Sequence, residues 1–157
     1  MQFDITILIA SYNNEPLISR AVRSCLGQLI LRSTIQIIVI DDCSSDNTFY
    51  RLQEFSDNIE IIQNDENEGI GSVSVKGLEK AKGQYFLRLD ADDFLSQHHC
   101  AFHKQILDYN PAIAFSYSDL IEVNDYLQKK NEPTTFPDDM SSTPILHGLK
   151  PAENKSD

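Results

Sequence analysis

Basic residues, long apolar runs and cysteines are scarce in this sequence, and each scarcity argues against a class of protein. The 157-residue chain carries 13 lysines and arginines against 24 aspartates and glutamates, a formal net charge of -11 at pH 7. A basic face that holds a polyanion is therefore disfavoured, and we predict no nucleic-acid partner. An acidic chain can still bind one phosphorylated small molecule where a metal ion or helix N-termini neutralise the phosphates.

Apolar runs and cysteines bear on the cell compartment. The longest apolar run, residues 5–10, is too short for the core of a signal peptide or for a membrane span, and no basic residue precedes it. We therefore expect a cytoplasmic protein without a transmembrane segment. Cys25, Cys43 and Cys100 are odd in number and far apart, which supports neither a disulfide framework nor a zinc ribbon. We expect three reduced thiols.

Short β-branched runs alternate with amphipathic stretches along the first 120 residues. The order is typical of an α/β fold, an open and mostly parallel sheet with flanking helices and right-handed crossovers. Strands are predicted over residues 5–10, 35–40, 59–63, 85–89 and 112–117, and helices over 16–29, 47–55, 72–82 and 97–109. We expect one domain over residues 1–120 and an irregular segment over 121–157, where no apolar stripe is sustained.

Polar clusters follow four of the predicted strands, at residues 11–14, 41–46, 64–69 and 90–93. Because ligands of open α/β sheets bind outside the carboxyl ends of the strands, these clusters should share one edge, which we call the rim. Each cluster alone is also what a solvated, helix-capping turn looks like. The acidic turn at 90–93 differs, since three carboxylates within four residues repel one another unless a cation relieves them. A hard divalent ion, Mg²⁺ or Mn²⁺, fits such a turn and a bound diphosphate.

Four motifs follow one another along the chain. They are ITILIASYN at residues 5–13, IVIDDCSSDNT at 38–48, NEG at 67–69 with Gly77 and AKG at 81–83, and LDADD at 89–93. Together they resemble family 2 glycosyltransferases, which have the GT-A fold. The order and spacing match the family over about residues 4–120. One D-x-D sequence is weak support for a metal site, whereas this ordered set is specific.

The resemblance implies a function and a set of site residues. The function is metal-dependent, inverting transfer of a sugar from a nucleotide-diphosphate sugar, of the UDP type, to a glycan or lipid-linked acceptor in surface polysaccharide or glycolipid synthesis. Contact with the inner membrane face would follow from a lipid-linked acceptor. The implied nucleotide-sugar site comprises Ala10, Ser11, Tyr12, Asn13, Asp41, Asp42, Asn67, Gly69, Lys76, Asp90, Ala91 and Asp93, with Asp92 and Asp90 as ligands of Mn²⁺ or Mg²⁺.

Individual roles also follow from the resemblance. Ala10, Ser11 and Tyr12 would line the base and ribose pocket, and Asp42, with Asp41 beside it, would accept a hydrogen bond from a uracil-type base. Asp90 would contact the ribose or the sugar as well as the metal, whereas Asp93 would support the metal ligands or touch the sugar.

The sequence departs from the family pattern at two places. An Arg-Asn pair common in the family is replaced by part of Ser74-Val75-Lys76, so that Lys76 would contact phosphate as a point charge only. The general base, normally far downstream of the metal motif, is not identified. Asp138 and Asp139 are paired carboxylates there, but their Pro-flanked stretch is typical of a loop.

Other readings stay open at this point. The chain could be a truncated donor-binding module without transferase activity, and its sheet edge near the C-terminus could be covered by another subunit. A nucleotidyltransferase is less consistent, since residues 11–14 form no Gly-rich basic loop. His99 and His103 have the i, i+4 spacing of zinc ligands, but no third ligand is evident. Arg88 is placed to form an ion pair with the acidic turn.

Overall fold

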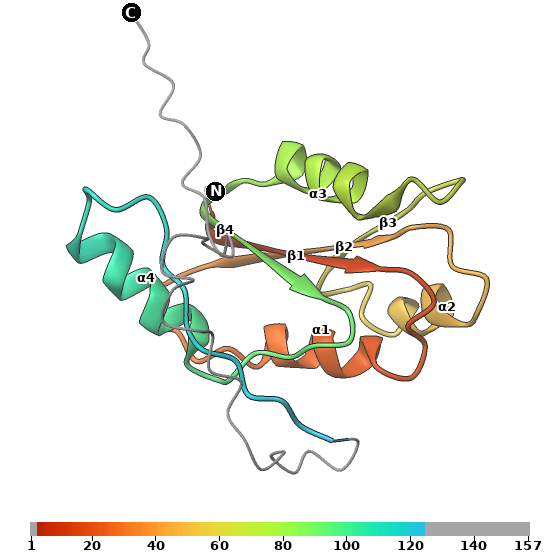
Figure 1. Ribbon diagram of the computed structural model, residues 1–157, viewed down its shortest axis with the longest axis horizontal. Coiled ribbons are helices and arrows are strands. Elements are labelled where there is room, and N and C mark those ends of the chain that lie inside the picture. The colour runs from red at the N-terminus through yellow and green to blue at the C-terminus, as the bar shows by residue number, and fades with distance from the viewer. Residues whose placement is uncertain (1–2, 125–157) are drawn as a thin grey trace, which may run out of the picture.

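The protein is described by a computed structural model in which residues 3–124 are placed (Figure 1). Strands and helices alternate strictly along this part of the chain. The elements are β1 (Phe3–Ser11), α1 (Ile18–Leu26), β2 (Ile35–Asp41), α2 (Thr48–Gln53), β3 (Glu60–Gln63), α3 (Gly69–Lys80), β4 (Gly83–Asp90) and α4 (His99–Tyr109). The α/β fold predicted from the sequence is confirmed.

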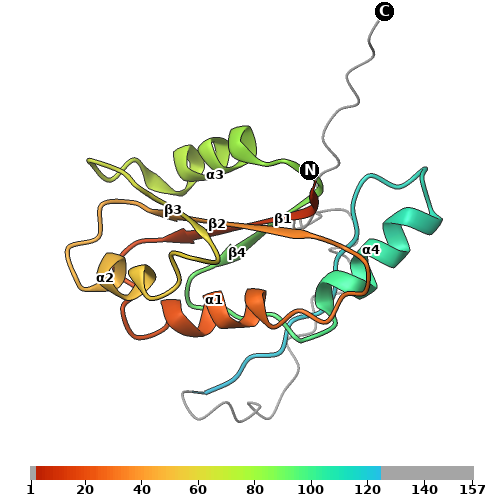
Figure 2. The same cartoon turned by 180° about the vertical axis from the view of Figure 1, so that it is seen from behind.

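All four strands are parallel and lie in the order β3-β2-β1-β4. The sheet separates two helical layers: α1, α2 and α4 lie on one face and α3 on the other (Figures 1 and 2). The central strands β1 and β2 are buried on both faces, which explains why their sequences are continuous apolar runs instead of alternating ones.

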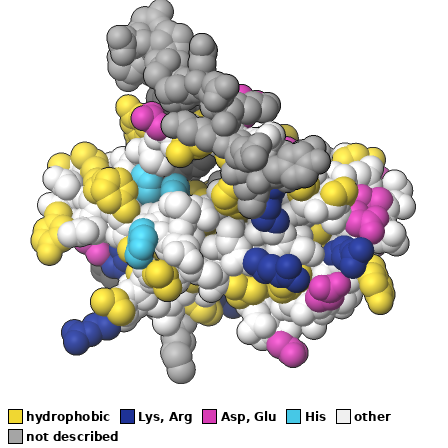
Figure 3. Space-filling view, turned by 90° about the horizontal axis from the view of Figure 1, so that it is seen from below, with side chains coloured by type: hydrophobic (Ala, Val, Ile, Leu, Met, Phe, Trp, Pro, Cys, Tyr) yellow, Lys and Arg dark blue, Asp and Glu magenta, His cyan; other side chains and the backbone are white. Residues whose placement is uncertain are grey.

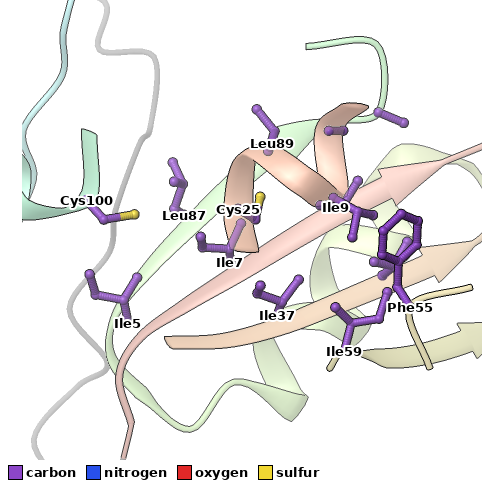
Figure 4. Packing of buried hydrophobic residues seen from close by; sticks show 14 of the residues in the cluster. Ile5, Ile7, Ile9, Cys25, Ile37, Phe55, Ile59, Leu87, Leu89 and Cys100 are labelled. Atoms are coloured by element: carbon purple, nitrogen blue, oxygen red, sulfur yellow. The ribbon is translucent and has the colours of Figure 1, made fainter. Parts of the chain in front are cut away.

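The larger core fills the space between the sheet and α1. Alternate residues of the strands point to this side, and Figure 4 shows Ile5, Ile7 and Ile9 of β1 beside Leu87 and Leu89 of β4. From the helical layer come Ile18, Ala21, Val22 and Cys25 of α1, which recur at helical spacing. Burial of apolar side chains on this face is what holds α1 against the strands.

The smaller core lies under α3. Leu8 and Ala10 of β1 pack there with Ile38 and Ile40 of β2 and with Val73 of the helix. Gly77, one turn after Val73, lies so close to the sheet that an added Cβ would come within 2.4 Å of Leu8 Cδ2. The missing side chain therefore sets how deeply α3 lies on the sheet.

A buried polar network lies at the end of the sheet where β4 begins. Thr6 Oγ1 donates to Gln36 Oε1 at 2.8 Å and accepts from Gly83 N at 2.9 Å, while Lys82 N donates to Gln36 Oε1 at 2.9 Å. A Cβ on Gly83 would lie 2.4 Å from Thr6 N. These bonds satisfy backbone groups that the turn between α3 and β4 would otherwise leave unpaired.

One predicted strand is wrong. Residues 112–117 form no strand, and Ile113 N instead donates to Asn110 O in a turn at 3.0 Å. The buried residue of this stretch is Ser116, whose hydroxyl lies 2.8 Å from His103 Nδ1, whereas Tyr117 is 61% exposed. A short apolar run forms a strand only where a sheet edge accepts it, and this stretch does not pair with β4.

Helix and strand limits differ from those predicted by at most three residues. Helix α3 begins at Gly69, three residues before the predicted start at 72. It ends at Lys80, close to the end predicted from its basic residues. The early start depends on Asp42, the residue after β2, whose carboxylate accepts Gly69 N. The irregular segment predicted for 121–157, Asp138 and Asp139 included, lies almost wholly outside the described residues.

The surface and the thiols agree with the composition. Acidic and basic side chains lie close together toward the α2 end of the face that carries α1, and histidines lie toward α4 (Figure 3). Within residues 3–124, no helix is long and apolar enough to cross a membrane. Cys25, Cys43 and Cys100 are free, as predicted, and burial raises the pKa of the Cys25 and Cys100 thiols to about 12.

Candidate functional site

The parallel register brings the ends of the four strands to one edge. Ser11 lies beside Asp41, Asp41 beside Gln63, and Ala10 beside Asp90. The turns after the strands consequently meet at the rim, as the positions of the polar clusters predicted. The end of β1 is central, with the turn after β2 on one side of it and the acidic turn after β4 on the other.

Strand alternation decides which rim side chains can face a ligand over α3. Ala10 belongs to the core under α3, so its register neighbour Asp90 faces the same side. Ser11 and Asp41 continue the alternate residues of β1 and β2 that face α1, and Ala91 belongs to the core on that side. The buried side chains of Ser11, Asp41 and Ala91 therefore leave mainly backbone atoms for contact with a ligand.

The turns after β1 and β2 are tied together by hydrogen bonds. Asn13 has φ 52°. Its Oδ1 accepts a hydrogen bond from Ser45 N at 2.8 Å, and its backbone N donates to Ser44 Oγ at 2.9 Å. Asn14 N donates to the buried Thr48 Oγ1 at 2.8 Å. The side chain of Asn13 thus supports the turn, while Tyr12 remains 48% exposed at the rim.

Asp46 completes this junction and was not among the predicted site residues. Its carboxylate accepts Thr48 N at 2.9 Å and Glu15 N at 3.1 Å, as a capping side chain does at a helix start. Burial raises the pKa of Asp46, but the bonds from the Thr48 hydroxyl and from these backbone groups outweigh it and lower the pKa. The Asp-x-Thr spacing before α2 was the signal available in the sequence.

Asp42, in the turn after β2, caps the start of α3. Its Oδ1 accepts Asn64 Nδ2 at 2.7 Å and Glu68 N at 3.0 Å, and its Oδ2 accepts Gly69 N at 2.8 Å. Gly69 has φ 82°, a left-handed conformation that suits glycine, and it opens the helix. Asp42 therefore uses three of about four lone-pair directions on protein donors.

Lys76 joins the same network. Its ammonium group donates to Asn64 Oδ1 at 2.9 Å and forms an ion pair with Glu68. Burial raises the pKa of Asp42, yet the hydrogen bonds from Glu68 N, Asn64 and Gly69 N, with the Lys76 charge, outweigh it and lower the pKa. The structure thus brings together three predicted residues, Asp42, Gly69 and Lys76, while Asn67 lies exposed in the loop beside them.

The acidic turn on the other side of β1 is open to solvent. Asp90 has a side chain 48% exposed, and Arg88 Nη2 lies 3.4 Å from its Oδ1, the ion pair expected from the sequence. Asp92 and Asp93 are exposed, and Asp93 N donates to Asp90 O at 3.0 Å to close the turn. Ala91 anchors the turn in the core.

Asp90 and Asp92 have the donor chemistry for a divalent ion that is bound together with a diphosphate. Mg²⁺ and Mn²⁺ in nucleotide sites need only one or two protein carboxylates, because phosphates and water complete the shell. In the described part of the chain, no group of three or more His, Cys, Asp or Glu side chains could hold a metal ion on its own. His99 and His103 stack with ring centroids 4.4 Å apart, and His103 lies against Ser116.

Three polar residues, two in α1 and one directly after it, were missed as site residues. Arg20, Ser24 and Gln28 all bind the loop that carries the acidic turn; Arg20 Nη2, for example, donates to Asp92 O at 2.6 Å. In the sequence their spacing looks like an ordinary solvated helix face. Nothing local in the chain indicates a partner some seventy residues away.

This chain is similar in sequence to known proteins. The family model of glycosyl transferase family 2 matches residues 6–147. Succinoglycan biosynthesis protein ExoO of Rhizobium meliloti is 35% identical over 57% of this chain and 26% of its own length. UDP-Glc:alpha-D-GlcNAc-diphosphoundecaprenol beta-1,3-glucosyltransferase WfgD of Escherichia coli is 36% identical over 57% and 35%. The chain thus spans about a quarter to a third of the length of these relatives.

Solved structures share the fold. Staphylococcus aureus TarS in complex with UDP superposes with a TM-score of 0.64 at 23% identity, over 69% of this chain and 33% of that one. A mannosyltransferase of Pyrobaculum calidifontis in complex with GDP-Man and Mn²⁺ gives a TM-score of 0.56 at 20% identity, over 62% and 30%. The resemblance to a GT-A fold, expected from the motifs, is confirmed.

Proposed function

The chain belongs to glycosyl transferase family 2, and from that premise we propose that it forms the donor-binding part of a metal-dependent sugar transferase. The donor is a nucleotide-diphosphate sugar, and we infer a uridine nucleotide because TarS, a neighbour in fold, has been solved with UDP. The observation that carries the proposal is the exposure of Asp90 and Asp92 at the rim, directly beside the end of β1. Exposed carboxylates at the carboxyl end of a parallel sheet are placed to receive a ligand.

The nucleoside would bind over the end of β1. Tyr12 offers an exposed ring for stacking, and backbone atoms of Ala10, Ser11 and Asn13 offer polar contacts. The remaining lone-pair direction of Asp42 is available to one N–H of the base, since three others are used. Asp41 and Lys76 then act through the network that holds Asp42, and Asn67 and Gly69 line the loop nearby.

The diphosphate would bind on the side of the acidic turn. Asp92, with Asp90, would hold Mg²⁺ or Mn²⁺, which when bound supplies positive charge against the leaving diphosphate. Arg88 already neutralises part of the charge on Asp90, and Asp93 closes the turn through its backbone N–H. Ala91 fixes the turn to the core, so that the carboxylates on either side keep their places.

The reaction that we propose is a single displacement at the anomeric carbon, with inversion. The acceptor hydroxyl would attack as the bond to the nucleotide diphosphate breaks, and its proton would pass to a carboxylate base. We assign that base to no residue within 3–124. The acceptor would be a glycan or a lipid-linked sugar, as in the WfgD relative, whose name specifies a diphosphoundecaprenol-linked acceptor. The setting would be surface polysaccharide or glycolipid synthesis at the cytoplasmic membrane face.

Calorimetric titration of UDP and several UDP-sugars, with and without Mn²⁺, tests the donor site. We expect binding that strengthens with Mn²⁺ and that loses this gain in Asp92→Ala, whereas Asp57→Ala, an exposed carboxylate remote from the rim, behaves as wild type. Release of free sugar from the bound donor would support an enzyme, and binding without release would favour a donor-binding module. Absence of nucleotide binding both with and without Mn²⁺ would defeat the proposal.

A further inference from the structure

The loop that follows β4, residues 91–98, carries the acidic turn but has almost no secondary structure of its own. Its internal backbone bonds run from Asp93 N to Asp90 O at 3.0 Å and from His99 N to Ser96 O at 3.1 Å. A metal site needs carboxylates held in place before the ion arrives, because an ordered ligand set loses less entropy on binding. Another element must therefore order this loop.

Helix α1 and the segment directly after it supply ordering contacts through a polar stripe made of Arg20, Ser24 and Gln28. Arg20 and Ser24, at i and i+4, lie on one side of α1, and Gln28 lies just beyond the end of the helix. Each contacts a different part of the loop. Arg20 Nη2 donates to Asp92 O at 2.6 Å, Ser24 Oγ accepts Leu95 N at 3.0 Å, and Gln28 both donates to Ser96 O at 2.7 Å and accepts Cys100 N at 2.9 Å.

Arg20 is the member of the stripe nearest the carboxylates. Its hydrogen bond ends on the carbonyl of Asp92, the residue whose side chain we propose as the main metal ligand. Its guanidinium also lies 4.9 Å from the centroid of the Phe94 ring, a cation–π contact. The two contacts hold the chain before and after Asp93.

We propose that Arg20 is a positioning residue for the metal site, and that Ser24 and Gln28 extend its hold along the β4–α4 loop. This inference rests on the proposed function, since it assigns the ordered loop to metal binding. Arg20 touches no reacting atom in this scheme. It fixes the peptide group from which the Asp92 carboxylate projects, as residues behind a metal ligand commonly do.

The test compares Mn²⁺ binding to the full chain in the presence of saturating UDP, followed by the electron paramagnetic resonance signal of free Mn²⁺. Arg20→Met keeps an apolar stem beside Phe94 but removes the donor, and we expect the Mn²⁺ dissociation constant to rise about tenfold. Affinity for UDP without metal should stay within about twofold. Arg23→Met is the matched control: the same residue type on the same helix, its guanidinium 5.7 Å from the Phe55 ring instead of the loop.

A second variant keeps the test decisive if Arg20→Met does not fold. Ser24→Ala removes the acceptor of Leu95 N, farther from the carboxylates, and should weaken Mn²⁺ binding by about threefold, less than the loss of a direct support. Wild-type Mn²⁺ affinity in both variants, or an equal loss in Arg23→Met, would overturn the positioning role and leave the proposed function intact. Absence of Mn²⁺ binding in the wild type would instead overturn the proposed function and this role together.

Discussion

The turn after β2 and the turn after β4 carry the same kind of side chain and lie on either side of β1, but they use their carboxylates differently. Asp41 and Asp42 are buried and accept hydrogen bonds from Ser44, Gln63, Asn64, Glu68 and Gly69. Asp90, Asp92 and Asp93 are at least partly exposed, and backbone carbonyls of their turn accept hydrogen bonds, Asp90 O from Asp93 N and Asp92 O from Arg20.

The difference separates two roles of a carboxylate, in stabilising the fold and in binding a ligand, that the sequence does not distinguish. A carboxylate with three protein donors contributes to folding and has little capacity left for a ligand, whereas an exposed one contributes little to folding and can exchange water for a metal. The β2 turn therefore shapes the rim, and the β4 turn presents charge to it. Substitutions in the two turns should separate stability from donor chemistry.

Removing the Asp42 carboxylate should produce the largest change. Asp42→Ala leaves the N–H groups of Glu68 and Gly69 and the amide of Asn64 without their acceptor, and we expect unfolding to become easier by about 3 kcal/mol. Urea denaturation measures this change. Asp65→Ala, an exposed carboxylate in the loop after β3, should stay within about 0.5 kcal/mol of wild type; equal losses in the two variants would mean that Asp42 is no cap.

The corresponding change in the β4 turn should affect turnover instead. Asp92→Asn should slow release of UDP from a saturating UDP-sugar with Mn²⁺ by about 100-fold, comparable to the loss of one electrostatic contact to a transition state. Its urea denaturation curve should match wild type, since the side chain is exposed. A destabilised protein with normal turnover would reverse the assignment of the two turns.

The pH dependence of stability should distinguish the turns more gently. The folded pKa of Asp42 lies below its ordinary value of 3.8, so its stabilising contribution is complete above that value and is lost as pH falls through the folded pKa. Wild type should lose more unfolding free energy between about pH 5 and pH 3 than Asp42→Asn, which has no carboxylate to protonate. Parallel curves for the two proteins would show that Asp42 titrates normally.

The smallest effect should come from Arg88→Met. The ion pair between Arg88 and Asp90 is about 40% exposed on one side and 48% on the other, and solvent screens such a pair. We expect a change of less than about 0.5 kcal/mol in unfolding free energy, measured by the same denaturation. A loss several times larger would mean that the β4 turn, like the β2 turn, is built into the folded core.

The sequence predicted the parts of the fold that depend on local pattern. Short apolar runs identified the four strands, and the polar clusters that follow them placed the rim correctly. Residues 112–117 show the limit: their short apolar run is typical of a strand, but pairing depends on a neighbouring edge that the sequence does not reveal. The start of α3 was missed for a similar reason, because its cap, Asp42, lies 27 residues before Gly69.

For the site, the sequence identified residues more readily than roles. Asp41 and Asp42 could be told apart only through strand parity and the donors around each carboxylate. Lys76 was predicted as a phosphate contact, and the structure shows it bound to Asn64 and Glu68. The contacts of α1 with the acidic turn could not be predicted, because Arg20 binds Asp92 O, which is distant in the chain and adjacent in space.

The absent side chain at Gly77 has a consequence for directed evolution of donor choice. Helix α3 starts at the Asp42 cap, so its distance from the sheet governs the loop that we propose borders the nucleoside, and the space under Gly77 is already filled by Leu8. Libraries that vary α3 should keep this glycine together with Val73. Diversity belongs at Ile70, Val75 and Leu78, which are exposed and can change identity without moving the helix.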